Sequence, residues 1–210
     1  MKILMLIDAL GVGGAESHVE ILATELAKMG HEIIVASAGG VLCKRLRGAN
    51  VRCVFLPKIL KNGQKRGKFS FICSFFALQG IISRLVRSIK PDIVHAHTRR
   101  TAFLVNRVCK AQKIPLIVTA HAVFSMRFPK NLLSKWGNQT IAVSEDIKKH
   151  LVANKIPQEQ IFVVANGVKL PICDNGDNAL LPSAEHPPVK HFDLPTIDTA
   201  LPKNEGEVDG

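Results

Sequence analysis

The chain has 210 residues, a net charge of +11 and 47% hydrophobic residues. That apolar share excludes a largely disordered protein, and the length favours one domain over two. The five cysteines include no Cys-x-x-Cys pair, which excludes a zinc ribbon and favours free thiols in a reducing compartment. The apolar start at residues 3–7 breaks at Asp8, too early for a signal peptide, so we expect a cytoplasmic protein.

Positive charge is concentrated before residue 171. Residues 171–210 hold two lysines and eight acidic residues, so the rest of the chain has 26 Lys and Arg against nine Asp and Glu. This excess of positive charge over residues 1–170 favours phosphorylated substrates, anionic lipid head groups or nucleic acid as partners. Aromatic residues make up only 5% and tyrosine is missing, which leaves little for base stacking, so we do not expect a nucleic-acid partner.

Seven β-rich segments alternate with helical patterns over residues 2–164. The expected strands are KILMLID, EIIVAS, VRCVFLP, DIVHAH, LIVTAH, TIAVS and IFVV. Most are continuously apolar, which is typical of parallel strands covered by helices on both faces. We expect one helix over residues 15–29, ended by Gly30, and another after Ser144, a good N-cap residue. The pattern predicts a single doubly wound, mainly parallel, Rossmann-like α/β domain.

A basic segment precedes an uncharged one in the middle of the chain. Residues 58–70, KILKNGQKRGKFS, are interpreted either as a solvated connection or as a lip that contacts anionic lipid at the cytoplasmic membrane face. Residues 69–83 carry no charge, but they fall short of the ~20 residues that span a bilayer. Their helical spacing continues to residue 89, so we expect a buried or half-buried helix; the alternative is a helix that rests on a membrane surface.

The character of the chain changes after residue 168. Residues 169–210 contain six prolines and no sustained apolar period. Such a segment cannot bury enough surface to offset its chain entropy. We therefore expect a folded domain over residues 1–168 and an acidic, proline-rich, disordered tail over residues 169–210.

The loop LGVGGAE follows the first expected strand and precedes the first helix. Gly11, Gly13 and Gly14 allow close approach of a ligand, and the helix offers unpaired N–H groups to an anion; the alternative is a tight turn without a ligand. Glu16 stands where the dinucleotide fingerprint needs a third glycine, and no Gly-Lys-Ser/Thr follows for a P-loop. The ligand is therefore expected to be phosphorylated, with no NAD and no other cofactor.

Histidines stand at two further strand ends. His95 and His97 are two residues apart and face one side of the same strand, and His95 is interpreted as a core histidine with a satisfied hydrogen bond. His121 closes LIVTAH at the carboxyl end, where ligands of open parallel sheets bind. A neutral imidazole there can hydrogen-bond a sugar hydroxyl or stabilise developing charge. No third metal ligand is evident in the sequence, so no metal site is expected.

Five segments carry a resemblance to a known family through their order and spacing. They are LIDALGVGGAESHVEILATELAKMGHEIIVAS, KPDIVHAHTRR, IPLIVTAH, TIAVSEDIKKHL and FVVANGV. Over about residues 1–168 the chain resembles the N-terminal, acceptor-side half of family 4 glycosyltransferases with GT-B architecture. The resemblance implies a retaining enzyme that moves a sugar from a nucleotide-sugar donor to an acceptor. It also implies two Rossmann-like domains with the active site between them.

The resemblance also implies roles for single residues. Gly13 and Gly14 match the loop that faces the donor diphosphate, and His121 matches the catalytic histidine that approaches the transferred sugar. The element at the passage into the second domain is matched by Asn166, Gly167 and Val168. The acceptor side is matched, more loosely, by His97, Thr98 and Arg99.

The second domain of the family pattern has no counterpart in this sequence. Family members take most nucleotide contacts from it, including two glutamates separated by seven residues, whereas here NGV leads into the acidic tail. Glu16 is interpreted as a first-turn helix charge and not as a substitute nucleophile. We expect weak binding and slow or no transfer by the chain alone, as a truncated product or as one subunit of a split enzyme whose C-terminal domain is a separate chain. The alternative is a non-catalytic binding or scaffold module that keeps the fold.

Overall fold

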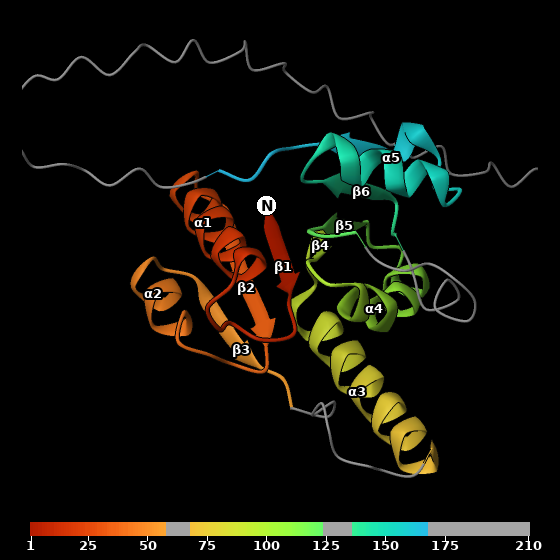
Figure 1. The fold of residues 1–210 in the computed structure, drawn as a ribbon. Coiled ribbons are helices and arrows are strands. Elements are labelled where there is room, and N and C mark those ends of the chain that lie inside the picture. Colours follow the sequence, from red (N-terminus) through yellow and green to blue (C-terminus); the bar gives the residue numbers. More distant parts are fainter. Residues whose placement is uncertain (58–67, 124–135, 168–210) are drawn as a thin grey trace, which may run out of the picture. The chain divides into compact units, whose positions relative to one another are not determined.

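The computed structural model describes residues 1–57, 68–123 and 136–167. All of them belong to one compact unit, Met1–Leu170, and the tail expected at 169–210 lies outside the described residues. The described residues form one parallel sheet with the strand order β3-β2-β1-β4-β5-β6-β7 (Figure 1). The strands are β1 (Lys2–Leu6), β2 (Glu32–Ser37), β3 (Arg52–Phe55), β4 (Ile93–Ala96), β5 (Leu116–Ala120), β6 (Gln139–Ala142) and β7 (Ile161–Val163). All seven expected strands and the predicted doubly wound α/β fold are confirmed.

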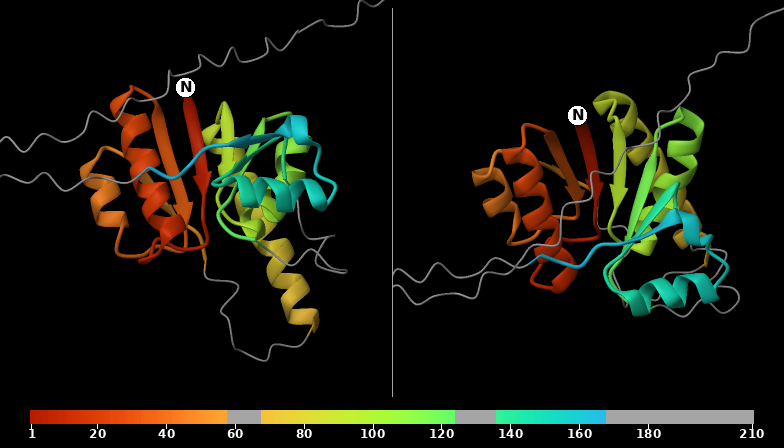
Figure 2. Two further views of the ribbon diagram at one scale, coloured as in Figure 1. Left: turned by 45° about the horizontal axis from the view of Figure 1, so that its top comes forward. Right: turned by 90° about the horizontal axis from the view of Figure 1, so that it is seen from above.

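Helices cover both faces of the sheet (Figure 2). They are α1 (Gly14–Lys28), α2 (Cys43–Gly48), α3 (Lys68–Ile89), α4 (Arg99–Gln112) and α5 (Glu145–Ala153), with a 3-10 turn at Gln158–Gln160. Alternate side chains of β1 pack on opposite sides: Ile3 and Met5 lie against α1 and α2, whereas Leu4 and Leu6 lie against α3 and α4. This burial on both faces is the reason why the strands are continuously apolar.

The helix ends follow the local signals in the sequence. α1 begins one residue before its predicted start, and the residue after its C-cap is Gly30, whose φ of +86° lies in the left-handed region that glycine adopts readily. α5 begins after Ser144, whose Oγ accepts a hydrogen bond from the N–H of Ile147 at 3.3 Å. The predicted cap is thus confirmed.

The uncharged stretch predicted as a helix is part of α3. Leu78, Ile82 and Val86 are buried at a spacing of four residues and join the core formed with α4. No helix of the described residues is long and apolar enough to cross a membrane. Of the basic segment 58–70, residues 58–67 lie outside the described residues.

The strand order reverses at the centre of the sheet, between β1 and β4. The chain runs from β1 outward to β2 and β3, and then returns to β4 on the other side of β1. Connections after β1 and β4 therefore diverge at their carboxyl ends, which is where open α/β sheets bind ligands. The N–H of His97 donates to the carbonyl of Leu6 at 2.9 Å, so the residue after β4 is fixed beside the end of β1.

Candidate functional site

Three histidines meet at this carboxyl edge, and we call them the histidine cluster: His18, His97 and His121. His97 follows β4, His121 follows β5, and His18 comes from α1. The ring centroids of His18 and His121 are 5.0 Å apart, and those of the other two pairs are 5.8 Å apart. The structure thus brings the predicted catalytic residue His121 and the predicted acceptor-side residue His97 together with His18, which sequence reasoning did not single out.

Hydrogen bonding separates His95 from the cluster. His95 is buried, and its Nε2 lies 2.7 Å from the hydroxyl of Thr119, so its interpretation as a satisfied core histidine is confirmed. By contrast, both ring nitrogens of His97 and of His121 are buried without a hydrogen-bond partner in the structure. His97 itself is only 2% exposed. Because a buried, unpaired polar atom costs about 1–3 kcal/mol, these four nitrogens point to a ligand.

Burial keeps the imidazoles of this edge neutral at pH 7. It lowers the pKa of His121 to about 4 and that of His95 to about 3. The pKa of His97 is held well below its ordinary value, mainly by burial and then by the neighbouring histidines. Burial also lowers the pKa of His18. A neutral imidazole presents one N–H donor and one lone pair, so the cluster can both donate to a ligand and accept from it.

The glycine loop is held beside the cluster by the loop after β2. The N–H of Leu10 donates to the carbonyl of Gly39 at 2.9 Å, and the N–H of Leu42 donates to the carbonyl of Leu10 at 3.1 Å. Gly40 has a φ of +152°, and a β-carbon there would collide with the carbonyl of Leu10. Only glycine therefore allows the two loops to pack this closely.

The N-terminus of α1 is formed by glycines, with Glu16 in its first turn. Gly13 is its N-cap and provides no side-chain cap, and Gly14 is its first residue. Glu16 lies in the first turn, as expected, and its carboxylate occupies the space that a side chain at residue 13 would need. A β-carbon on Gly14 would meet no atom within 4 Å, so the space in front of that residue is open. His18 lies farther along the same helix, which places this N-terminus next to the cluster.

Asp8 and the start of α4 complete the edge. Asp8 Oδ2 lies 3.9 Å from Arg100 Nε, and burial raises the pKa of Asp8, while Arg100 and a hydrogen bond from Thr98 partly offset that rise. The hydroxyl of Thr98 also accepts from the N–H of Thr101 at 3.2 Å, and the N–H of Thr98 donates to the Thr101 hydroxyl at 3.2 Å. Thr98 is therefore the N-cap of α4, and Arg99 is the first residue of that helix.

The family model for Glycosyltransferase Family 4 matches residues 12–170. The chain belongs to this family. A relative described as an uncharacterized 42.6 kDa protein in the cps region of Klebsiella pneumoniae is 25% identical and is matched over 75% of this chain and 52% of its own length. This family 4 chain thus spans about half the length of that relative.

Solved structures share the fold of the family 4 domain. A glycosyltransferase from Rickettsia africae is 24% identical, with a TM-score of 0.63 over 80% of this chain and 43% of its own. HepE from Anabaena in complex with UDP-glucose is 19% identical, with a TM-score of 0.60 over 80% and 44%. A UDP-GlcNAc 2-epimerase from Neisseria meningitidis bound to UDP-GlcNAc is 18% identical, with a TM-score of 0.52 over 79% and 46%. Because a glycosyltransferase and an epimerase share this fold, the fold alone does not select the reaction.

The remaining predicted residues of the family 4 domain lie after β7. Asn166 and Gly167 are exposed there, and Val168 lies outside the described residues. Their assignment to a passage into a second domain stays a prediction.

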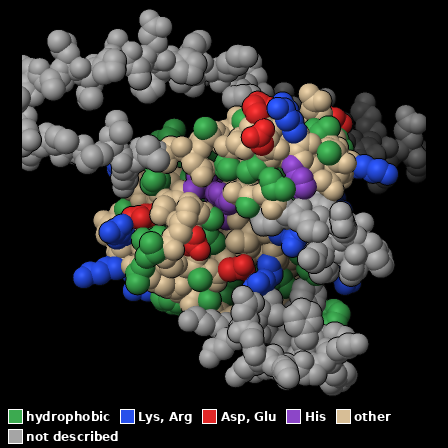
Figure 3. All heavy atoms as spheres, viewed as in Figure 1, with side chains coloured by type: hydrophobic (Ala, Val, Ile, Leu, Met, Phe, Trp, Pro, Cys, Tyr) green, Lys and Arg blue, Asp and Glu red, His purple; other side chains and the backbone are tan. Residues whose placement is uncertain are grey.

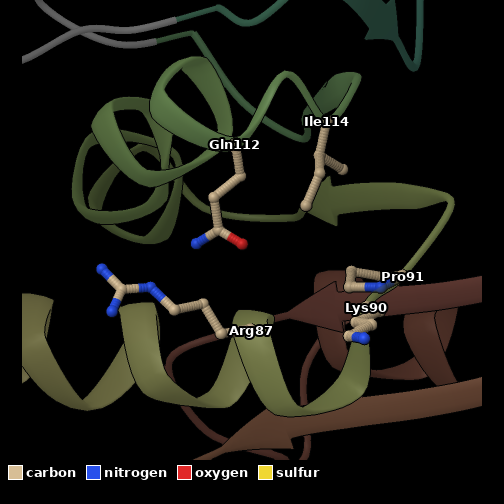
Figure 4. A pocket seen from close by; sticks show the side chains of 5 residues that line it. All are labelled: Arg87, Lys90, Pro91, Gln112 and Ile114. Carbon is tan, nitrogen blue, oxygen red and sulfur yellow. The ribbon is translucent and has the colours of Figure 1, made fainter.

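A groove at the opposite edge of the sheet provides a contrast to the cluster. It has a volume of about 400 Å³ and is lined by Arg87, Lys90, Pro91, Gln112 and Ile114, at the ends of α3 and α4 (Figure 4). Figure 4 shows the amide of Gln112, from α4, pointing toward α3, the helix that carries Arg87. Ligands of open parallel sheets bind at carboxyl ends, whereas this groove precedes β4 and β5. The histidine cluster is therefore the better candidate site.

Proposed function

We propose that the chain is the acceptor-side half of a retaining glycosyltransferase that moves a sugar from a nucleotide-sugar donor to an acceptor. The observation that carries the proposal is the position of His121. Its unpartnered imidazole lies beside α1, the helix that begins at Gly13 and Gly14 and has open space in front of Gly14. One edge of the sheet thus offers an anion site and, next to it, a neutral hydrogen-bonding ring.

The chemistry assigned to this edge follows from charge. During transfer, negative charge develops on the leaving diphosphate, and free N–H groups at a helix N-terminus stabilise it. His121 is neutral because burial lowers its pKa to about 4, so it hydrogen-bonds a hydroxyl of the sugar without adding a charge. Structures of HepE, which has a similar fold, contain UDP or UDP-glucose. They support a uridine nucleotide-sugar as the donor class. Retention of configuration rests on the family resemblance.

We further propose that a second, donor-binding domain completes the cleft, as another part of a longer polypeptide or as a separate subunit. Three valines stand exposed in the loops at the carboxyl edge: Val12 at 91%, Val41 at 67% and Val123 at 59%. These apolar side chains, on three loops of the same edge, support a surface that another domain covers. The chain also spans about half the length of its relative, which supports this reading.

The acceptor is proposed to be lipid-linked, with peripheral contact at an anionic membrane. The basic composition of the body supports this proposal. On the face shown in Figure 3, the Lys and Arg side chains are scattered. The basic segment 58–70 is the part of the sequence assigned to the lipid contact. Arg99, at the start of α4, is the predicted acceptor-side residue next to His97.

Nuclear magnetic resonance of the isotope-labelled chain tests the site. Adding UDP-glucose should shift the amide signals of Gly13, Gly14 and His121, whereas NADH at equal concentration should not. Gly14→Ala adds a methyl group where no atom lies within 4 Å, so it should preserve the fold yet block the diphosphate. We expect it to weaken binding by at least tenfold, ~1.4 kcal/mol. Gly48→Ala, on α2, is the matched control.

Three outcomes would contradict the proposal. Shifts that gather around Arg87 and Lys90 would place the ligand in the opposite groove. Equal binding by Gly14→Ala and the unaltered chain would remove the diphosphate from α1. Full transferase turnover by the purified chain alone would refute the need for a second domain. If no nucleotide-sugar shifts any signal, the scaffold function is favoured instead.

A further inference from the structure

The ring nitrogens of the histidine cluster are close enough to share one ion. One nitrogen from each of His18, His97 and His121 lies within 4.8 Å of the others. Among the described residues, this is the one group of three or more His, Cys, Asp or Glu side chains with such spacing. The three rings come from α1 and from the ends of β4 and β5, so three separate elements converge on one point.

We propose that His18, His97 and His121 bind a divalent transition-metal ion of the Zn²⁺ class. Imidazole nitrogen is a preferred ligand of zinc, copper and nickel, and three histidines leave a fourth position open for water or a substrate oxygen. Hard ions such as Mg²⁺ and Ca²⁺ prefer oxygen ligands, which these three side chains do not supply.

The distances require only small movements of the rings. At a Zn–N bond of about 2.0–2.1 Å and tetrahedral angles, ligand nitrogens lie roughly 3.3 Å apart. The three nitrogens, which lie within 4.8 Å of one another, must therefore come closer together by up to about 1.5 Å to bind one ion. Both ring nitrogens of His97 and His121 lack hydrogen-bond partners, so no existing bond has to break.

Hydrogen bonding also defines which histidines belong to the site. A metal ligand must be an imidazole nitrogen with a free lone pair. In the described residues the ring nitrogens of His97 and His121 have no hydrogen-bond partner. His95 stays outside the set, because its Nε2 is already engaged with Thr119 at 2.7 Å.

Cobalt is the probe for this site, because four-coordinate Co²⁺ absorbs visible light and is displaced by Zn²⁺. Metal-free full-length chain is titrated with Co²⁺ and then with Zn²⁺, without nucleotide-sugar, so the result does not depend on transferase activity. The test variants are His18→Ala and His18→Gln. The controls are His31→Ala, in the turn after α1, and the double variant His186→Ala/His191→Ala, which removes the two histidines of the tail. Circular dichroism and a urea midpoint establish that each variant folds.

We expect saturation at one equivalent, a four-coordinate Co²⁺ spectrum and displacement by one equivalent of Zn²⁺. Since losing an outer-shell partner of a metal ligand typically costs roughly 10- to 100-fold in affinity, losing His18 itself should weaken binding by roughly 100-fold or more. The control variants should bind Co²⁺ with an affinity within about twofold of that of the unaltered chain. The proposal is overturned by an absence of saturable binding, by an unchanged affinity in both His18 variants, or by loss of binding in the tail variant. If His18→Ala does not fold, His18→Gln and His121→Ala decide by the same criteria.

Discussion

Lowering the pH from 7 to 5 should destabilise this domain through its buried histidines. In the folded protein the pKa of His95 is lowered from 6.5 to about 3, and that of His121 is lowered from 6.5 to about 4. In both cases the main cause is burial, which disfavours the charged ring. Below pH 6.5 the unfolded chain binds protons at these rings, whereas the folded protein does not bind them until each lowered pKa is reached. The free energy of unfolding therefore falls as the pH falls through that window.

The size of the effect follows from the two pKa values. At pH 5 the solution lies about 1.5 pH units below the unfolded pKa, and each unit corresponds to about 1.4 kcal/mol. His95 thus contributes a loss of about 2 kcal/mol at pH 5, and His121 contributes a smaller loss, because it is only partly buried and solvent screens its charge. A loss of about 2 kcal/mol is already a large fraction of the ~5–15 kcal/mol that stabilises a typical domain.

Urea unfolding at pH 7, 6 and 5, followed by circular dichroism with a chelator present, measures this loss. In His95→Gln the amide can still bond the Thr119 hydroxyl but takes no proton. The variant should therefore lose about 2 kcal/mol less than the unaltered chain between pH 7 and pH 5. His31→Gln is the control for replacing a histidine outside this group. The reasoning is refuted if the unaltered chain loses no stability over this range, or if His95→Gln loses as much as it does.

Two pairs of variants, each a test and its control, probe the backbone near the site, and urea unfolding measures their stability. Gly40→Ala should lower the free energy of unfolding by about 1–3 kcal/mol, because the φ of Gly40 is +152° and a β-carbon there would collide with the Leu10 carbonyl. Gly80→Ala, in α3, should raise it by about 0.5–1 kcal/mol, because a β-carbon at Gly80 meets no atom within 4 Å and alanine favours a helix. Equal effects of the two would contradict the packing argument. Thr98→Ala removes the N-cap hydroxyl of α4 and should lower the free energy of unfolding by about 0.5–2 kcal/mol. Thr98→Ser keeps a capping hydroxyl and should therefore retain most of the stability. A Thr98→Ala variant as stable as the unaltered chain would show that the cap contributes nothing.

The sequence could predict most of the fold, because the signals are local. Short β-rich runs, most of them continuously apolar, mark the seven strands, and each run needs only its own residues to be recognised. Ser144 marks the start of α5 for the same reason, since a cap hydroxyl bonds an N–H three residues away. Bounds for α2 and α4 were not part of the prediction. The capping pair Thr98 and Thr101, followed by helically spaced buried residues, is the local signal that identifies α4.

The candidate site divides differently between sequence and structure. The sequence by itself determined that Gly13, Gly14 and His121 follow strands at a ligand-binding edge, because the edge depends only on strand direction. Only the tertiary structure decided that His18 joins His97 and His121. The sheet order places β1 next to β4 and β4 next to β5, while the packing of α1 turns one side of the helix toward them. Residues 18, 97 and 121 are far apart in the chain, so their meeting depends on long-range packing that no local pattern of residues encodes.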